Sequence, residues 1–230
     1  MSSALYTILH TNGEPTMIKA VIFDMDGVIL DTEKLLVKYW CQAAHEFGYP
    51  MERWHALHIR SLAGKFCEPL LKEWFGQDCD YKTVRARRME LMKADIEQNG
   101  LEKKKGVDEL LEFLGEKGIK RAVATATDIE RATSYLTKIG VYDKFDRIIC
   151  ASMVESGKPK PDIYIYAAKE LGLDPGECIA IEDSPNGVTS AYNAGCRTVM
   201  VPDLTQPDPE LEKMLYAKCD SLLDVIELLK

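Results

Sequence analysis

Short apolar runs recur along the chain and indicate buried strands. Each run is apolar through most of its length and rich in β-branched residues, instead of alternating with polar positions. Such runs are typical of strands that are covered on both faces, as in a parallel sheet. The predicted strands are residues 19–23, 121–125, 147–150, 178–181 and 197–201.

Helical patterns separate most of these strands. Apolar residues recur at helical spacing in 107–118, 129–139, 161–172, 185–195 and 221–229. Asp128 and Ser184 stand where N-cap residues are preferred, and glycines follow several of the last turns. Strands that alternate with helices predict an α/β fold with a parallel sheet.

The stretch from Thr32 to Gly100 departs from this alternation. It contains three helical stripes of apolar and aromatic residues and no strand pattern. So long an insertion after the first strand predicts a small second domain made of helices. We expect an α/β core at 17–31 and 101–230, a helical domain at 32–100, and a disordered extension at 1–16. The hinges are expected near Asp31 and Glu33 and in the "NGLEKKKG" segment.

The composition and net charge of the chain limit the classes of partner that we expect it to bind. The formal net charge is −8 and the pI is near 5.2, which disfavours nucleic acid and anionic membranes as partners. No apolar stretch approaches the ~20 residues of a membrane span. Seven cysteines without metal-ligand spacing are typical of buried thiols in a reducing compartment. We therefore expect a cytoplasmic protein.

Residues capable of chemistry follow four of the predicted strands. In open α/β sheets, ligands bind beyond the carboxyl ends of the strands. The candidates at these ends are Asp24, Asp26, Thr125, Thr127, Lys158, Glu182, Asp183 and Ser184. Each has an ordinary alternative, such as a helix cap, a strand-end threonine or a solvated lysine. Their occurrence together at four strand ends favours an active site.

The two aspartates after the first strand must repel each other, and like charges at close range need a cation, a shared proton or plenty of water. Clustered carboxylates are hard oxygen ligands, which Mg²⁺ prefers. Such an arrangement suits phosphoryl transfer, in which one aspartate attacks phosphorus and the other moves protons. A threonine hydroxyl and a lysine ammonium would then hold the phosphoryl oxygens.

Four sequence motifs extend this interpretation. "DMDGV" (24–28), "ATAT" (124–127), "GKPKPD" (157–162) and "IEDSPNGV" (181–188) resemble, in order, the four motifs of the haloacid dehalogenase superfamily. The chain is most similar to its phosphatases and β-phosphoglucomutase-like enzymes, which carry a helical cap. This resemblance implies a Rossmann-like core, a mobile cap inserted after the first motif, and a monomer.

The same resemblance implies a role for each motif residue. Asp24 is the expected nucleophile and Asp26 the general acid and base. Thr125, Ala126 and Lys158 are the expected phosphoryl-binding residues. The expected Mg²⁺ ligands are Asp24, the backbone carbonyl of Asp26, and Asp183 with Glu182 close by.

Residues of the predicted cap distinguish a phosphatase from a phosphosugar mutase. By the resemblance, β-phosphoglucomutases carry a histidine near Leu36 and an arginine near Cys67, and this chain has neither. Gly64 keeps a family-like cap loop, with Arg60 and Lys65 as nearby cations. Lys65 is a candidate substrate contact, and a solvated lysine is the alternative. We therefore expect a phosphatase acting on a small phosphorylated metabolite such as a sugar phosphate. A β-phosphoglucomutase-like mutase and a catalytically silent binding protein are the alternatives.

Overall fold

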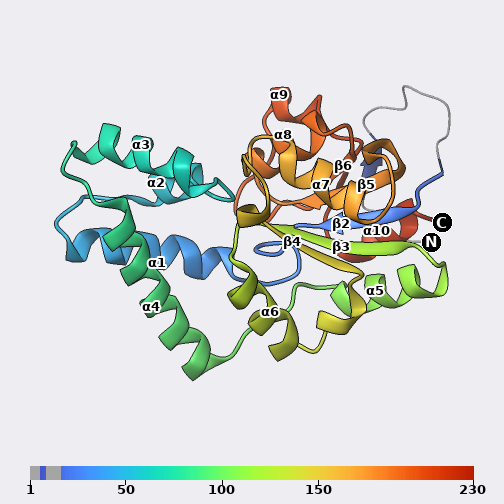
Figure 1. The fold of residues 1–230 in the computed structure, drawn as a ribbon, viewed down its shortest axis with the longest axis horizontal. Helices are drawn as coiled ribbons and strands as arrows, with labels where there is room; N and C mark the ends of the chain where they lie inside the picture. Colours follow the sequence, from blue (N-terminus) through green and yellow to red (C-terminus); the bar gives the residue numbers. More distant parts are fainter. Residues whose placement is uncertain (1–5, 9–16) are drawn as a thin grey trace.

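The computed structural model describes residues 6–8 and 17–230. Within them, a seven-stranded sheet with its covering helices forms one lobe, and helices α1 to α4 form a second lobe beside it (Figure 1). The strand order is β1-β7-β6-β5-β2-β3-β4, parallel throughout except for the β1–β7 pair. The strands are β1 (Tyr6–Ile8), β2 (Ala20–Phe23), β3 (Lys120–Thr125), β4 (Arg147–Cys150), β5 (Cys178–Glu182), β6 (Arg197–Met200) and β7 (Ala217–Cys219).

Strand β2 explains why the strands read as unbroken apolar runs. Val21 and Phe23 belong to the hydrophobic core on one face of the sheet, whereas Ala20 and Ile22 belong to the core on the other. All four residues are buried because helices cover both faces. β2 lies between β5 and β3, which is the point where the strand order changes direction. Its carboxyl end is therefore the expected position of a ligand site.

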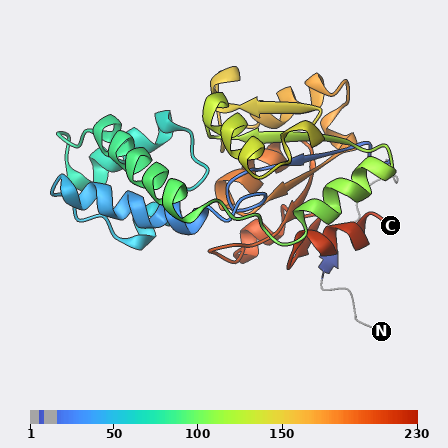
Figure 2. The same ribbon diagram turned by 90° about the horizontal axis from the view of Figure 1, so that it is seen from below.

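The helices of this lobe form a layer on each face of the sheet (Figure 2). Helices α5, α6 and α10 pack on one face and α7 and α8 on the other. Their bounds are α5 (Val107–Glu116), α6 (Ile129–Lys138), α7 (Asp162–Glu170), α8 (Pro185–Asn193), α9 (Pro209–Glu212) and α10 (Leu222–Leu228). Three short 3₁₀ turns among the described residues are η1 (Tyr142–Lys144), η2 (Ala151–Met153) and η3 (Pro175–Glu177).

The predicted α/β fold is confirmed, with differences at the edge of the sheet. The five predicted strands correspond to β2 through β6, with ends that differ by at most one residue. β7 and α9 were not predicted, because three or four residues carry too little periodicity to be recognised. The expected disorder of residues 1–16 is wrong at Tyr6–Ile8, which pairs with β7. The rest of that prediction lies outside the described residues.

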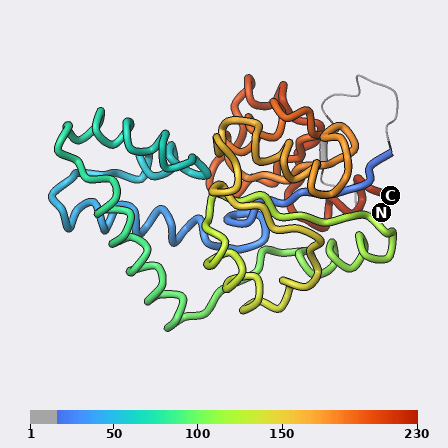
Figure 3. Tube along the Cα trace, in the orientation of Figure 1, coloured from blue at the N-terminus to red at the C-terminus, as the bar shows by residue number. Residues whose placement is uncertain are grey.

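Helices α1 (Glu33–Glu46), α2 (Arg53–His58), α3 (Gly64–Phe75) and α4 (Tyr81–Asn99) make up the second lobe, which we call the cap. They enclose their own hydrophobic core, in which the rings of Trp40 and Tyr81 stack at 5.9 Å. The two chain segments that enter and leave the cap run side by side (Figure 3). There the Asp31 amide donates to the Glu102 carbonyl at 3.0 Å.

The loop between α2 and α3 returns from the cap to the sheet lobe. The Ala63 amide donates to the Lys158 carbonyl at 3.0 Å, and the Asn186 side chain donates to the carbonyls of His58 and Arg60. The cap is therefore held against the strand ends by its linkers and by this loop. All seven cysteines are free thiols and six are buried, as predicted. None of the helices described here has the length and apolar character that crossing a membrane requires.

Candidate active site

The carboxyl end of β2 delivers Asp24 to the rim of the sheet. Its amide continues the ladder to the Ile181 carbonyl at 2.9 Å, which places it beside the end of β5. Gly27 then turns the chain away with φ of +88°, a left-handed conformation that favours glycine. A Cβ at this position would lie 2.5 Å from an oxygen of Asp183. The glycine is therefore required both by the turn and by the close approach of Asp183.

Lys158 joins two of the strand-end carboxylates. Its ammonium forms an ion pair with Asp24 and a second one with Glu182 at 2.6 Å, and its side chain is fully buried. The Tyr164 hydroxyl also donates to Glu182, at 2.6 Å. Burial alone would lower the pKa of Lys158, but Asp24 and Glu182 raise it above its ordinary value. Lys158 is therefore a fixed cation.

Asp24, Glu182 and Asp183 form a buried acidic group suited to a divalent cation. Their oxygens lie within 4.8 Å of one another. Asp24 Oδ2 and Asp183 Oδ1 are buried and have no hydrogen-bond partner among the described residues. Burial is the main cause that raises the pKa of Asp24 well above its ordinary value and that of Asp183 to about 7. Unpartnered hard oxygens in a like-charged cluster fit a divalent cation such as Mg²⁺, which stays a prediction.

Two threonine hydroxyls bind the carboxylate of Asp26. The Thr32 hydroxyl donates to Asp26 Oδ1 at 2.6 Å, and the Thr127 hydroxyl donates to Oδ2 at 3.0 Å. Thr125 in turn accepts the Thr127 amide at 3.0 Å. Each carboxylate oxygen of Asp26 therefore accepts a hydrogen bond from a threonine, and its backbone carbonyl stays the predicted contact with a metal. Thr32 was not identified from the sequence, since a hydroxyl six residues from its partner carries no motif signal.

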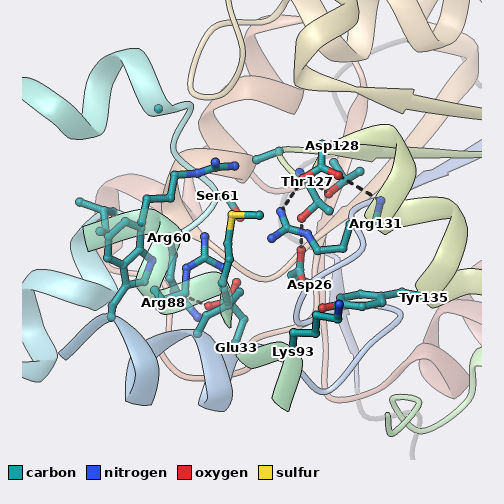
Figure 4. A pocket seen from close by; sticks show the side chains of 18 of the residues that line it. Asp26, Glu33, Arg60, Ser61, Arg88, Lys93, Thr127, Asp128, Arg131 and Tyr135 are labelled. Atoms are coloured by element: carbon teal, nitrogen blue, oxygen red, sulfur yellow. Dashed lines mark hydrogen bonds and ion pairs between the residues drawn. The ribbon is translucent and has the colours of Figure 1, made fainter. Parts of the chain in front are cut away.

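The cap contributes a buried cation to the acidic group. Arg60, which is 4% exposed, donates from Nη1 to Asp183 Oδ2 at 3.1 Å and from Nη2 to Thr205 at 2.6 Å. Its Nε lies 4.0 Å from Glu33 Oε2 (Figure 4). Burial, reinforced by Asp183, raises the pKa of Glu33 well above its ordinary value. The sequence indicated Arg60 only as a nearby cation, and its bond to Asp183 depends on how the cap loop packs.

One expectation about the hinge needs correction. Asp31 and Glu33 were both assigned to the hinge, and Asp31 does lie there, 3.5 Å from Lys104. Glu33 instead begins α1 with a side chain that is 1% exposed and directed into the site. Asp31 and Glu33 are only two residues apart, but Asp31 precedes α1 and Glu33 is its first residue, so their side chains enter different environments.

A cavity of about 1120 Å³ lies between the cap and the strand ends. Asp24, Asp26, Thr125 and Ala126 line its core side. From the cap it is lined by Gly64 and by both positions that set the phosphatase expectation, Leu36 and Cys67. The predicted nucleophile, acid and phosphoryl-binding loop therefore face one cavity.

Lys65 is placed differently from the other predicted contacts. Its ammonium donates to the Glu155 carbonyl at 2.9 Å and to the Ser156 hydroxyl at 2.7 Å. Lys65 is not among the residues that line the cavity. In this structure it joins the cap loop to the core instead of facing a substrate.

A parallel α/β sheet carries paired aspartates after its central strand, and a helical cap covers them. This combination of fold and site defines the class of enzyme. Residues 21–201 match the family model described as haloacid dehalogenase-like hydrolase. The chain belongs to this haloacid dehalogenase-like hydrolase family, and the predicted resemblance and enzyme class are confirmed.

Individual relatives agree with this assignment. A Bacillus subtilis protein named "Putative phosphatase YhcW" is 34% identical and covers 90% of this chain and 97% of its own. A "Phosphorylated carbohydrates phosphatase" of Thermotoga maritima is 32% identical over 79% of this chain and 83% of its own. The crystal structure of a β-phosphoglucomutase from Clostridium difficile is 27% identical, with a TM-score of 0.75, and covers 90% of this chain and 92% of that one.

Proposed function

We propose that this enzyme is an Mg²⁺-dependent phosphatase that hydrolyses a small phosphate monoester through a phosphorylated Asp24. The observation that carries this proposal is the position of Asp24. It lines the cavity, is paired with the fixed cation of Lys158, and belongs to the acidic group that fits a divalent cation. Few arrangements other than phosphoryl transfer need a nucleophilic carboxylate, a buried lysine and a hard-cation site together.

In the first step a carboxylate oxygen of Asp24 bonds to phosphorus while the bond from phosphorus to the ester oxygen breaks. Asp26 donates a proton to the departing oxygen, so the product leaves as an alcohol. In the second step water attacks phosphorus, Asp26 takes a proton from this water, and the bond to Asp24 breaks. Phosphate is released and both aspartates return to their starting states.

The remaining residues hold the groups that react. Thr125 and Ala126 line the cavity after β3, and we propose that they bind the transferring phosphoryl group together with Lys158. Thr32 and Thr127 orient the Asp26 carboxylate. Bound Mg²⁺, held by Asp24, Asp183, the Asp26 carbonyl and the nearby Glu182, supplies positive charge that offsets the negative charge of the phosphoryl oxygens.

Support for a sugar phosphate comes from the relatives, one of which is named for phosphorylated carbohydrates. The second candidate function is a phosphosugar mutase, which the similarity to β-phosphoglucomutase favours. The apolar Leu36 and the buried Cys67 on the cavity wall favour the phosphatase instead. A monomeric state and a cytoplasmic location stay predictions.

A phosphate-release screen across phosphorylated metabolites, with Mg²⁺ and with a chelator, tests the proposal. We expect Mg²⁺-dependent release from sugar phosphates and from p-nitrophenyl phosphate. The screen includes β-glucose 1-phosphate with a trace of its 1,6-bisphosphate. Conversion of this sugar without phosphate release would establish the mutase instead. Absence of any turnover, together with absence of Mg²⁺-dependent beryllofluoride binding, would indicate a silent binding protein.

A further inference from the structure

Arg88 of α4 is a buried cation that the proposed reaction does not use. The residue is 5% exposed and lines the cavity. Its Nη1 lies 3.8 Å from the Met92 sulfur, and its guanidinium lies 5.0 Å from the centre of the Trp40 ring. Its Nε has no hydrogen-bond partner, and no carboxylate lies within 4 Å of it, among the described residues. Arg88 is therefore a buried charge without a protein counter-ion.

Two arginines near Arg88 act on it more strongly than the one nearby carboxylate, that of Asp26. Burial, followed by the guanidinium groups of Arg131 and Arg85, lowers the pKa of Arg88 to about 10. Figure 4 shows Arg88 and Arg131 approaching the cavity from the cap and from the core. Arg131 is paired with Asp128 at 3.2 Å, but the side chain of Asp128 is 43% exposed and partly screened by solvent. The cavity thus has a positively charged region between the cap and the sheet lobe.

Such a region is unfavourable until an anion binds there. A buried guanidinium without a partner loses its hydration and gains no compensating hydrogen bonds. The guanidinium fork matches a carboxylate or a phosphate, to which it forms paired hydrogen bonds. Strongly perturbed and unpaired groups of this kind cluster at functional sites.

The position of Arg88 relative to the two aspartates shows which part of a substrate it would meet. Asp26 is the carboxylate whose charge acts on Arg88, whereas Lys158 pairs with Asp24 and is not among the residues that line the cavity. Asp26 is the proposed proton donor to the departing oxygen. An anion at Arg88 would therefore belong to the leaving group and not to the phosphoryl group that Asp24 receives.

We propose that the leaving group of the substrate carries a second anionic group, a carboxylate or a phosphate, which binds Arg88 beside Arg131. This inference rests on the proposed function and names the substrate class of the same site. Sugar bisphosphates and phosphorylated sugar acids belong to that class. Sugar monophosphates, whose leaving group is uncharged and which we call the neutral compounds for that reason, would bind without the contact.

Calorimetric titration tests the preference in the presence of Mg²⁺. The protein carries Asp24→Asn, so that no compound is turned over during the measurement. Two matched pairs of compounds are compared: 6-phosphogluconate with glucose 6-phosphate, and fructose 1,6-bisphosphate with fructose 6-phosphate. We expect the more anionic member of at least one pair to bind about 10- to 100-fold more tightly, as a hydrogen-bonded charge pair provides. The pair that responds distinguishes a carboxylate from a second phosphate.

Variants on the same background identify the residue responsible. Arg88→Met should reduce the preference to less than about 3-fold and leave the neutral compounds within about 2-fold, because only the charge contact is lost. Arg88→Lys, which keeps the charge but not the fork, should retain part of the preference and serves if the methionine variant is unstable. Arg87→Met is the matched control, since Arg87 is exposed and pairs with Glu46 on the surface.

Equal binding of both members in each pair, or no binding of any of the four compounds, would overturn the inference. An equal loss for anionic and neutral compounds in Arg88→Met would also do so, because it would show that Arg88 only supports the cap. Phosphate release by the unmodified enzyme is measured separately. Its absence would reject the proposed function and would leave the binding preference as an independent result.

Discussion

The two sides of the cavity differ in charge and in how their groups are held. On the sheet side, the acidic group of Asp24, Glu182 and Asp183 is fixed by Lys158 and by the strand ends that carry it. On the cap side, Arg60 and Arg88 are buried cations on a loop and a helix. Arg60 reaches across to the acidic group, whereas Arg88 has no acidic partner among the described residues. The sheet side therefore holds the groups that we propose to react. The cap adds one cation that pairs across the site and one that has no acidic partner among the described residues.

This difference suggests separate roles for the two sides, one in the reaction and the other in binding the metal or the substrate. Groups at the strand ends are positioned by backbone hydrogen bonds that also build the sheet, so they stay in place regardless of the substrate. Cap residues meet the site only through packing between the two lobes. We therefore expect changes on the sheet side to affect the reaction rate, and changes on the cap side to affect metal affinity or substrate choice.

The largest effect is expected for Asp24→Asn. Loss of the attacking carboxylate should lower kcat on the order of 10⁴-fold or more, because the covalent route is removed. Phosphate release and circular dichroism measure activity and fold. Asp31→Asn, in the hinge of the same segment, is the control and should keep kcat within about 3-fold. Substantial activity in Asp24→Asn would contradict the covalent mechanism.

Asp26→Asn should have the next largest effect, and its size should depend on the leaving group. Loss of the proton donor should cost about 10²- to 10⁴-fold with a sugar phosphate. The loss should be smaller with p-nitrophenyl phosphate, whose leaving group needs less protonation. Comparison of kcat/KM for the two substrates measures this difference. An equal loss for both would argue against Asp26 as the acid.

Arg60→Gln tests whether the cap contributes to the metal site. Arg60 binds Asp183 Oδ2, whereas Asp183 Oδ1 has no hydrogen-bond partner among the described residues. Loss of the Arg60 guanidinium should therefore let the Asp183 carboxylate move more freely. We expect Mg²⁺ affinity to fall about 10- to 100-fold, as for other partners of metal ligands. Titration of the metal-free protein with Mg²⁺ measures this affinity. Lys65→Gln, on the same loop but bonded to Ser156, should leave this affinity unchanged. Similar losses in both variants would indicate a general effect of the cap loop.

The smallest effect is on stability as a function of pH. Without metal, Asp183 has a pKa of about 7 in the folded protein against 3.8 as its ordinary value. The folded state therefore binds the proton more tightly, and this contribution is complete below pH 4 and lost as the pH rises to about 7. We expect the Tm of metal-free protein to fall between pH 5 and 8. Asp183→Asn should flatten this fall, and an unchanged slope would contradict the assignment.

Added Mg²⁺ should oppose this fall in Tm at higher pH. At about 100 times its Kd, a ligand that binds only the folded state stabilises it by about 2.7 kcal/mol, which corresponds to about 5 to 10 °C in Tm for a chain of this size. The effect should be larger at pH 8 than at pH 5, because protonated carboxylates compete with the metal. Measurement by scanning fluorimetry at both pH values checks the order. A larger effect at pH 5 would contradict the proposed ligands.

The sequence by itself determined the sheet and the residues along its rim. Runs such as Ala20–Phe23 are apolar throughout because both faces are covered, and this periodicity is visible without coordinates. The carboxyl ends of parallel strands meet at one edge, so the positions of Asp24, Thr125 and Glu182 follow from the order of the elements. The division into a core and a cap at residues 32 and 100 remains a prediction that the helix positions support.

Only the tertiary structure decided which cap residues reach the site. Arg60, Glu33 and Arg88 lie in stretches whose local pattern is that of ordinary helix and loop positions. Whether such a charge is solvated or buried depends on the angle at which one lobe packs on another, and that angle is set by contacts between residues far apart in sequence. Local periodicity carries no information about it, which is why Lys65 was expected in the site while Glu33 was expected outside it.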